Sequence, residues 1–105
     1  EYQTAAQASA IYPNIGSNIA YPTLGLCGEA GEVAEKVKKL FRDNEGFISQ
    51  EFRKNISKEL GDVLWYISAI ANECGLSLHI IAEENIEKLL SRKQRNTLGG
   101  SGDNR

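Results

Sequence analysis

The chain has 105 residues, with 12 lysines and arginines against 14 aspartates and glutamates, and 41% of its residues are hydrophobic. This length suits a single domain over residues 1–105, and the composition is typical of a soluble globular protein rather than a disordered or fibrous one. A formal net charge of −2 offers no basic surface to polymeric nucleic acid or to a membrane. No stretch reaches the roughly 18 to 20 apolar residues of a membrane span, and no export leader is visible. Because the two cysteines are far apart and resemble neither a disulfide scaffold nor a zinc site, we expect reduced thiols and a cytoplasmic protein.

Glycine, proline and polar clusters divide the first half of the chain into two predicted helices. An Ala- and Gln-rich segment predicts a short helix over residues 2–11, and residues 14–21 have the composition of a loop. Pro22, well placed in a first turn, opens a long helix over residues 22–41. Residues 42–46 then form a turn.

The second half of the chain contains two further predicted helices and a tail. Ser49 begins a helix that continues to residue 74, before Gly75. Ser77 can cap a fourth helix over residues 78–93. The Gly-rich segment 96–105 is either a mobile tail or a loop ordered by a partner or ligand.

Apolar residues recur every three or four positions in the three longer helices, which is typical of core-facing stripes. These stripes comprise Leu26, Ala30, Val33, Val37 and Leu40, then Ile56, Leu60, Val63, Ile67 and Ile70, and finally Leu78, Ala82, Ile86 and Leu89. No segment alternates with period two. The prediction is an all-α, four-helix bundle-like fold without a sheet, in which Cys27 and Cys74 are buried, reduced thiols.

The third predicted helix repeats a segment of the second. Glu29-Ala30-Gly31-Glu32-Val33 and Glu59-Leu60-Gly61-Asp62-Val63 share the pattern E-x-G-[E/D]-V. Each acidic pair has i, i+3 spacing, so both of its carboxylates lie on one edge of the helix, beside the apolar stripe. If the two helices pack along their stripes, four carboxylates converge.

Carboxylates that lie this close repel one another unless a cation neutralises them. Hard oxygen ligands suit Mg²⁺ or Mn²⁺, so we expect Glu29, Glu32, Glu59 and Asp62 to bind metal. A glycine inside each pair destabilises the helix by about 1 kcal/mol relative to alanine. Close helix approach or room for a ligand would offset this loss. The alternative is that such acidic pairs are solvated helix edges.

Two segments, Gly25–Lys39 (GLCGEAGEVAEKVKK) and Lys58–Ile67 (KELGDVLWYI), resemble the MazG-type nucleoside triphosphate pyrophosphohydrolases of the all-α NTP pyrophosphatase superfamily. The family signature, E-x-x-E, a spacer, then E-x-x-D, is matched by the four carboxylates above. The resemblance continues through residues 85–89 and 99–105. Gly28 stands where some branches carry another glutamate, which leaves the number of metals open.

This resemblance implies Mg²⁺-dependent hydrolysis of nucleoside or deoxynucleoside triphosphates between the α- and β-phosphates. It also implies that Glu29, Glu32, Glu59 and Asp62 hold the metal and act in catalysis. The products would be the monophosphate and pyrophosphate, and the role would be nucleotide-pool house-cleaning. It also implies an obligate helical homo-oligomer, at least a dimer. Trp65 lies opposite the apolar stripe of its own helix and favours such a second interface.

Six further residues are predicted to contact substrate, each with an ordinary alternative. Basic residues could bind phosphate or form ion pairs on solvated faces, Tyr66 could meet the sugar or triphosphate or be half-buried, and the amide of the fourth helix could contact substrate or another helix. They are Lys36, Lys39, Tyr66, Asn85, Lys88 and Arg92. Glu35 lies opposite the stripe and is expected to face solvent. Tyr12 and Tyr21 could stack on the base or pack locally.

Two other classes of protein also carry acidic residues on packed helices. A di-iron carboxylate bundle requires E-x-x-H motifs, which are absent, because the single histidine lies elsewhere. A non-catalytic helical interaction module would have only solvated acidic edges. It remains the alternative to the enzyme.

Overall fold

The computed structural model describes all 105 residues, and its regular structure is entirely helical. The helices are α1 (Tyr2–Gln7), α2 (Ala20–Asn44), α3 (Gln50–Glu73) and α4 (Leu78–Gln94). The predicted all-α class is therefore confirmed. None of the four helices combines the length and apolar character that crossing a membrane would require. By internal contacts the chain divides into two compact units, Glu1–Gly75 and Leu76–Arg105, and each is described by itself.

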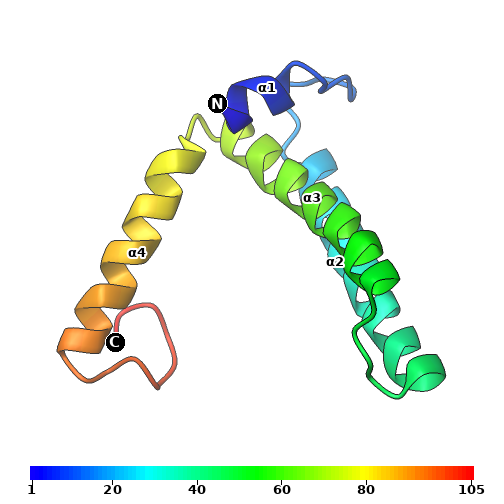
Figure 1. Cartoon of the computed structure of the whole chain (residues 1–105). Helices are drawn as coiled ribbons and strands as arrows, with labels where there is room; N and C mark the ends of the chain where they lie inside the picture. Colours follow the sequence, from blue (N-terminus) through cyan, green and yellow to red (C-terminus); the bar gives the residue numbers. More distant parts are fainter. The chain divides into compact units, whose positions relative to one another are not determined.

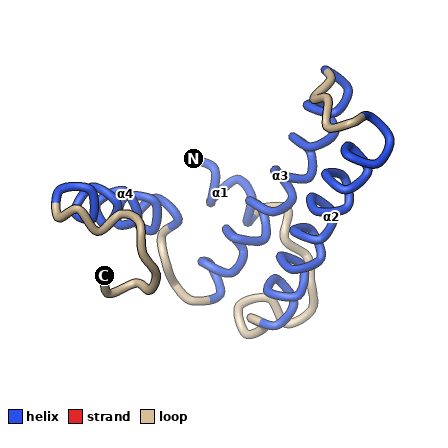
Figure 2. Tube along the Cα trace, turned by 90° about the horizontal axis from the view of Figure 1, so that it is seen from below, coloured by secondary structure: helices blue, strands red, loops and turns tan.

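In the first unit, α2 and α3 form a helical hairpin and lie side by side in both views (Figures 1 and 2). α2 ends where Glu45 and Gly46 adopt left-handed backbone with φ of 53° and 81°. The Ser49 side chain then accepts a hydrogen bond from the Phe52 N–H and caps α3, as the sequence predicts. The short turn makes the helices antiparallel, so the start of α2 lies beside the end of α3.

α1 is shorter than predicted and ends at Gln7 rather than near residue 11. The Ser9 hydroxyl donates to the Ala6 carbonyl and accepts a hydrogen bond from the Trp65 indole N–H at 2.9 Å. These contacts turn the chain out of the helix and hold it against α3. α1 therefore packs on the C-terminal part of α3.

The loop between α1 and α2 is anchored by one carboxylate at the end of α3. Glu73 accepts hydrogen bonds from the Gly16 N–H at 2.8 Å, from the Asn18 N–H at 2.9 Å and from the Tyr12 hydroxyl. The Asn18 side chain in turn accepts from the Tyr21 N–H, which starts α2 two residues before the predicted Pro22.

In the second unit, the Ser77 side chain caps α4 as predicted by accepting from the Ile80 N–H. The tail after α4 folds back through its own arginines. Arg92, with a side chain only 5% exposed, donates to the Gly102 and Asp103 carbonyls and to the Asp103 carboxylate. Arg105 donates to the carbonyls of residues 97, 98 and 102. The tail is thus a closed loop on α4, an arrangement that the sequence analysis did not predict.

Burial differs from the prediction at several positions. Leu40 is buried, but Leu60 and Ile86 are more than half exposed, although both lie on predicted core-facing stripes. Cys27 and Cys74 are free thiols, as predicted, but both are exposed. The prediction of buried thiols is therefore wrong.

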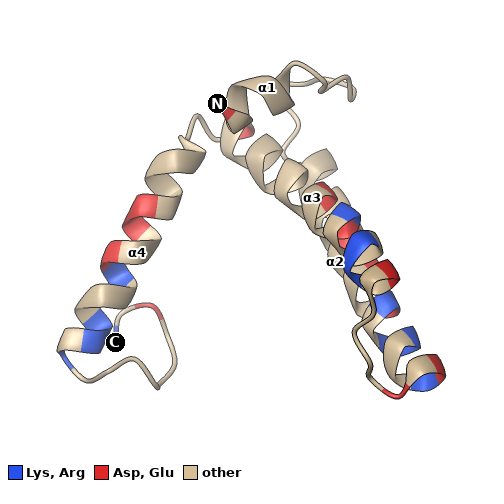
Figure 3. Ribbon diagram, viewed as in Figure 1, with Lys and Arg blue, Asp and Glu red and all other residues tan.

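Charged residues are unevenly distributed along the hairpin. Between residues 2 and 28 the chain has no Lys, Arg, Asp or Glu, and between residues 63 and 82 it has only Glu73. The end of the hairpin that carries α1 is consequently almost uncharged, whereas lysines, arginines and acids gather towards the α2–α3 turn (Figure 3). The repeated acidic motifs lie at the boundary between these regions.

Candidate metal and nucleotide site

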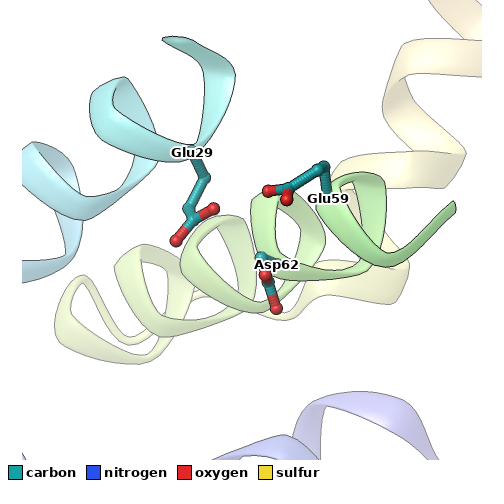
Figure 4. Close-up of side chains that lie close together, drawn as sticks. All are labelled: Glu29, Glu59 and Asp62. Carbon is teal, nitrogen blue, oxygen red and sulfur yellow. The ribbon is translucent and has the colours of Figure 1, made fainter. Parts of the chain in front are cut away.

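Three of the four predicted carboxylates come together between α2 and α3. Glu29, Glu59 and Asp62 each offer an oxygen within 4.8 Å of the oxygens of the other two. Figure 4 shows Glu29 on α2 and Glu59 on α3 directed towards each other, with Asp62 one turn further along α3. We call these three residues the acidic triad. Glu29 and Glu59 are half-buried and Asp62 is exposed, so the triad is open to solvent.

Glu32 is not part of the triad. It is exposed on α2, further around the helix from the apolar stripe than Glu29. Its charge still acts on the triad, because it is one of the groups that raise the pKa of Glu29. The predicted convergence thus holds for three carboxylates, with the fourth beside them.

The electrostatics of the triad are those of crowded acids. Loss of hydration raises the pKa of Glu29, and the Asp62 charge, a hydrogen-bonding contact with Glu59 and the Glu59 charge raise it further. Lys36 offsets part of the negative charge of the triad, since its ammonium lies 3.7 Å from the Glu59 carboxylate. This ion pair joins the two helices.

The glycines inside the two motifs do not serve close helix packing. A Cβ atom at Gly31 or at Gly61 would meet nothing within 4 Å. Close approach of another helix, one of the two explanations for these glycines, is therefore wrong at both positions. The other explanation, that the glycines leave room for a ligand, remains a prediction.

A hollow opens directly beside the triad. It is lined by Ser9, Glu29, Asp62, Trp65 and Tyr66. The Trp65 and Tyr66 rings meet edge to face, with centroids 5.1 Å apart and an interplanar angle of 86°. One side of this hollow is therefore acidic and another is aromatic.

Trp65 corrects one prediction. Its position opposite the apolar stripe of α3 predicts a second interface, because nothing on its own helix covers that side. In the structure the turn after α1 lies against this side, since the indole N–H donates a hydrogen bond to Ser9, so Trp65 gives no evidence for a partner subunit. Trp65 and Ser9 were both missed as site residues. A sequence signal existed for Trp65, which follows Asp62 by three positions and therefore shares its edge of α3.

The other predicted residues of the first unit have defined surroundings. Tyr12 and Tyr21 stack on each other, with centroids 4.8 Å apart and an interplanar angle of 9°, which fits the local-packing alternative. Lys39 is exposed near the α2–α3 turn and lines a shallow hollow that also includes Lys36 and Asp43. Glu35 forms an ion pair with Lys38 on the outer face.

Three predicted substrate residues lie on α4, in the second unit. Asn85 is exposed. Lys88 and Arg92 both pair with the tail carboxylate of Asp103, at 3.1 Å and 3.4 Å. Together with its hydrogen bonds to two tail carbonyls, this pairing makes Arg92 an organiser of the tail.

Comparison with known proteins identifies the family. The model of the MazG nucleotide pyrophosphohydrolase domain matches residues 20–96, from the start of α2 to just beyond α4. The chain is also 49% identical over 109 residues to the Gene 37 protein of Mycobacterium phage L5. This alignment covers 99% of the chain and 96% of the phage protein. No solved structure matches. With its four motif carboxylates inside the matched region, the chain belongs to the MazG nucleotide pyrophosphohydrolase family.

Proposed function

We propose that this protein hydrolyses nucleoside or deoxynucleoside triphosphates between the α- and β-phosphates, releasing the monophosphate and pyrophosphate. Members of the MazG family act on small-molecule nucleotides and generally use divalent metals. The observation that carries the proposal for this chain is the acidic triad, three carboxylate oxygens from two helices gathered within 4.8 Å.

The triad fits a hard divalent cation. All three donors are carboxylate oxygens, the ligands that Mg²⁺ and Mn²⁺ prefer, and the site is open enough for water and phosphate oxygens to complete the coordination. Glu29, Glu59 and Asp62 would hold Mg²⁺ directly, with Glu32 beside them. When bound, the metal would neutralise the triphosphate and lower the pKa of the attacking water.

The residues around the triad suit the rest of a nucleotide. Lys36 already places a positive charge beside Glu59, and Lys39 follows it on α2 by three residues towards the turn. Both could pair with phosphate oxygens. On the other side, Trp65 and Tyr66 offer aromatic surface to the sugar or base, as the hollow that they line adjoins Glu29 and Asp62.

The second unit belongs, in our proposal, to the same functional domain. The family match runs through α4, and Asn85, Lys88 and Arg92 are the predicted contributors from it. We propose further that the protein is a cytoplasmic homo-oligomer that removes unwanted nucleotides, and that it engages neither polymeric nucleic acid nor membranes.

The first prediction concerns the loss of carboxylates. Glu59→Gln and Asp62→Asn should each reduce pyrophosphate release by roughly a hundredfold or more, because each removes a metal ligand while keeping the shape of the side chain. Glu32→Gln should have a smaller effect, since Glu32 lies outside the triad. A coupled assay would measure the release of pyrophosphate, and circular dichroism would check that each variant keeps its helicity.

Glu35→Gln is the matched control, because Glu35 lies on the same helix and pairs only with Lys38 on the outer face. It should keep full activity. Equal activity of Asp62→Asn and wild type would favour the non-catalytic interaction module instead.

A further inference from the structure

Gly25 differs from the other three glycines inside α2 and α3. A Cβ atom at this position would collide with the Tyr66 ring, lying 2.6 Å from Cδ1 and closer still to Cε1 and Cζ. At Gly28, Gly31 and Gly61 a Cβ atom would meet nothing within 4 Å. The Tyr66 ring thus lies directly on the backbone of α2 at Gly25.

This contact lies one helical turn from the acidic triad. Gly25 precedes Glu29 by four residues, and Tyr66 follows Asp62 by four residues on the antiparallel partner helix. The pair therefore occupies the next level of the same interhelical seam. Loss of hydration and the nearby Tyr21, Glu29 and Asp62 raise the pKa of Tyr66, which agrees with this close surrounding.

Trp65 bounds the Tyr66 ring on one side. It meets the ring edge to face, and its indole N–H donates a hydrogen bond to Ser9 in the turn after α1. A side chain at residue 25 would consequently push either the ring out of the seam or α2 away from α3. Either movement alters the geometry at which Glu29 faces Glu59 and Asp62.

We propose that Gly25 is a positioning residue of the metal site, because its missing side chain lets Tyr66 seat on α2 and set the helix spacing at which the acidic triad converges. Local helix stability gives no reason for a glycine here, since alanine is the better helix former. The proposal rests on the proposed binding of divalent metal by the triad.

The test compares Gly25→Ala with Gly28→Ala, a glycine on the same helix with open space around it. Binding of Mn²⁺ alone would be measured by electron paramagnetic resonance, and the melting temperature of the metal-free protein by circular dichroism. Gly25→Ala should weaken Mn²⁺ binding by about tenfold or more and lower the melting temperature. Gly28→Ala should leave Mn²⁺ binding unchanged and keep or raise the melting temperature.

A double-mutant cycle with Tyr66→Ala tests whether the Tyr66 ring causes the effects of Gly25→Ala on Mn²⁺ binding and melting temperature. Without the ring, Gly25→Ala should raise the metal-free melting temperature, because only the better helix propensity remains. It should also weaken Mn²⁺ binding no further than Tyr66→Ala alone. Should Gly25→Ala fail to fold, recovery of a folded chain in the double variant would support the proposal equally.

Three results would overturn the proposal. In the first, Gly25→Ala binds Mn²⁺ as tightly as wild type. In the second, Gly25→Ala lowers the melting temperature equally with and without the Tyr66 ring, and in the third, the double variant does not fold. Failure of the wild-type chain to bind Mn²⁺ is a different result. It would reject the proposed metal site itself, and the positioning role with it.

Discussion

Glu29 illustrates at the scale of one residue how a binding site opposes stability. Its carboxyl lies beside Glu59 and Asp62 without a basic partner of its own, and its pKa is raised. A carboxyl with a raised pKa keeps its proton to higher pH in the folded chain than in the unfolded chain. The native state therefore binds more protons, and stability falls as the pH rises through that range.

Glu29→Gln should accordingly raise the melting temperature of the metal-free protein at neutral pH, because it removes one of the mutually repelling charges. It should also remove the part of the pH dependence that comes from this carboxyl. Thermal unfolding by circular dichroism in EDTA, at several values between pH 4 and 8, would measure both effects.

The same melting experiment with added Mn²⁺ tests whether the triad binds metal. The wild-type melting temperature should rise with Mn²⁺, since a ligand that binds only the native state stabilises it, whereas Glu29→Gln should respond weakly. Glu35→Gln again serves as the control and should follow wild type with and without metal. A lower metal-free melting temperature for Glu29→Gln would refute the view that the triad is electrostatically strained.

At this scale, the helical angle of each acid allowed the sequence to predict the position of Glu29 well. The same reasoning failed for Trp65, because its indole contacts Ser9 in the turn after α1, more than fifty residues away along the chain. The angular position of a residue on its own helix follows from the rotation of about 100° per residue. The sequence of that helix does not show which other segment packs on the residue.

At the scale of elements, α1 and the loop before α2 depend on Glu73. This carboxylate accepts hydrogen bonds from Tyr12 and from two backbone N–H groups, and those bonds lower its pKa, with the Tyr12 contact having the largest effect. Loss of hydration, and then the same contact, raise the pKa of Tyr12 to about 12. One charged residue thus orders the largely uncharged end of the hairpin.

Glu73→Gln should lower the melting temperature near pH 7. A carboxyl with a lowered pKa stabilises the fold above its unfolded pKa, and this stabilisation is lost as the pH falls through the folded value. The difference between variant and wild type should therefore shrink on acidification from about pH 5 towards pH 3. Glu84→Gln, at an exposed position on α4, should unfold as wild type does at each pH. A constant difference across this range would contradict the role given to the charge.

The tail is a second element that depends on one side chain. Arg92→Gln should speed amide hydrogen exchange over residues 97–105, because it removes a buried guanidinium that bonds Gly102 and Asp103. Arg53, exposed on α3, provides the control through Arg53→Gln, which should leave exchange in the tail unchanged. Unchanged exchange in Arg92→Gln would show that other contacts close the loop.

Helix starts with a side-chain cap were predictable, as Ser49 and Ser77 demonstrate, because an N-cap is a local interaction. The early end of α1 and the closed tail were not. Both depend on hydrogen bonds from groups that no local pattern indicates as partners, such as Ser9 with Trp65 and Arg92 with backbone carbonyls.

At the scale of the whole molecule, the near-neutral net charge conceals a partition. The uncharged end of the hairpin carries the aromatic side chains of the hollow, and the charged end carries Lys36 and Lys39. The acidic triad lies where the two regions meet. In the proposed function, the base would lie against the aromatic side, and the phosphates would bind the metal held by the triad and the lysines beyond it.

The most direct test of this account is phosphorus NMR of the wild-type protein with a panel of nucleoside and deoxynucleoside triphosphates and Mg²⁺. The account predicts that pyrophosphate and the nucleoside monophosphate appear together in equal amounts from at least one substrate, and that EDTA abolishes the reaction. Release of orthophosphate with the diphosphate, or no turnover of any nucleotide with either Mg²⁺ or Mn²⁺, would contradict it.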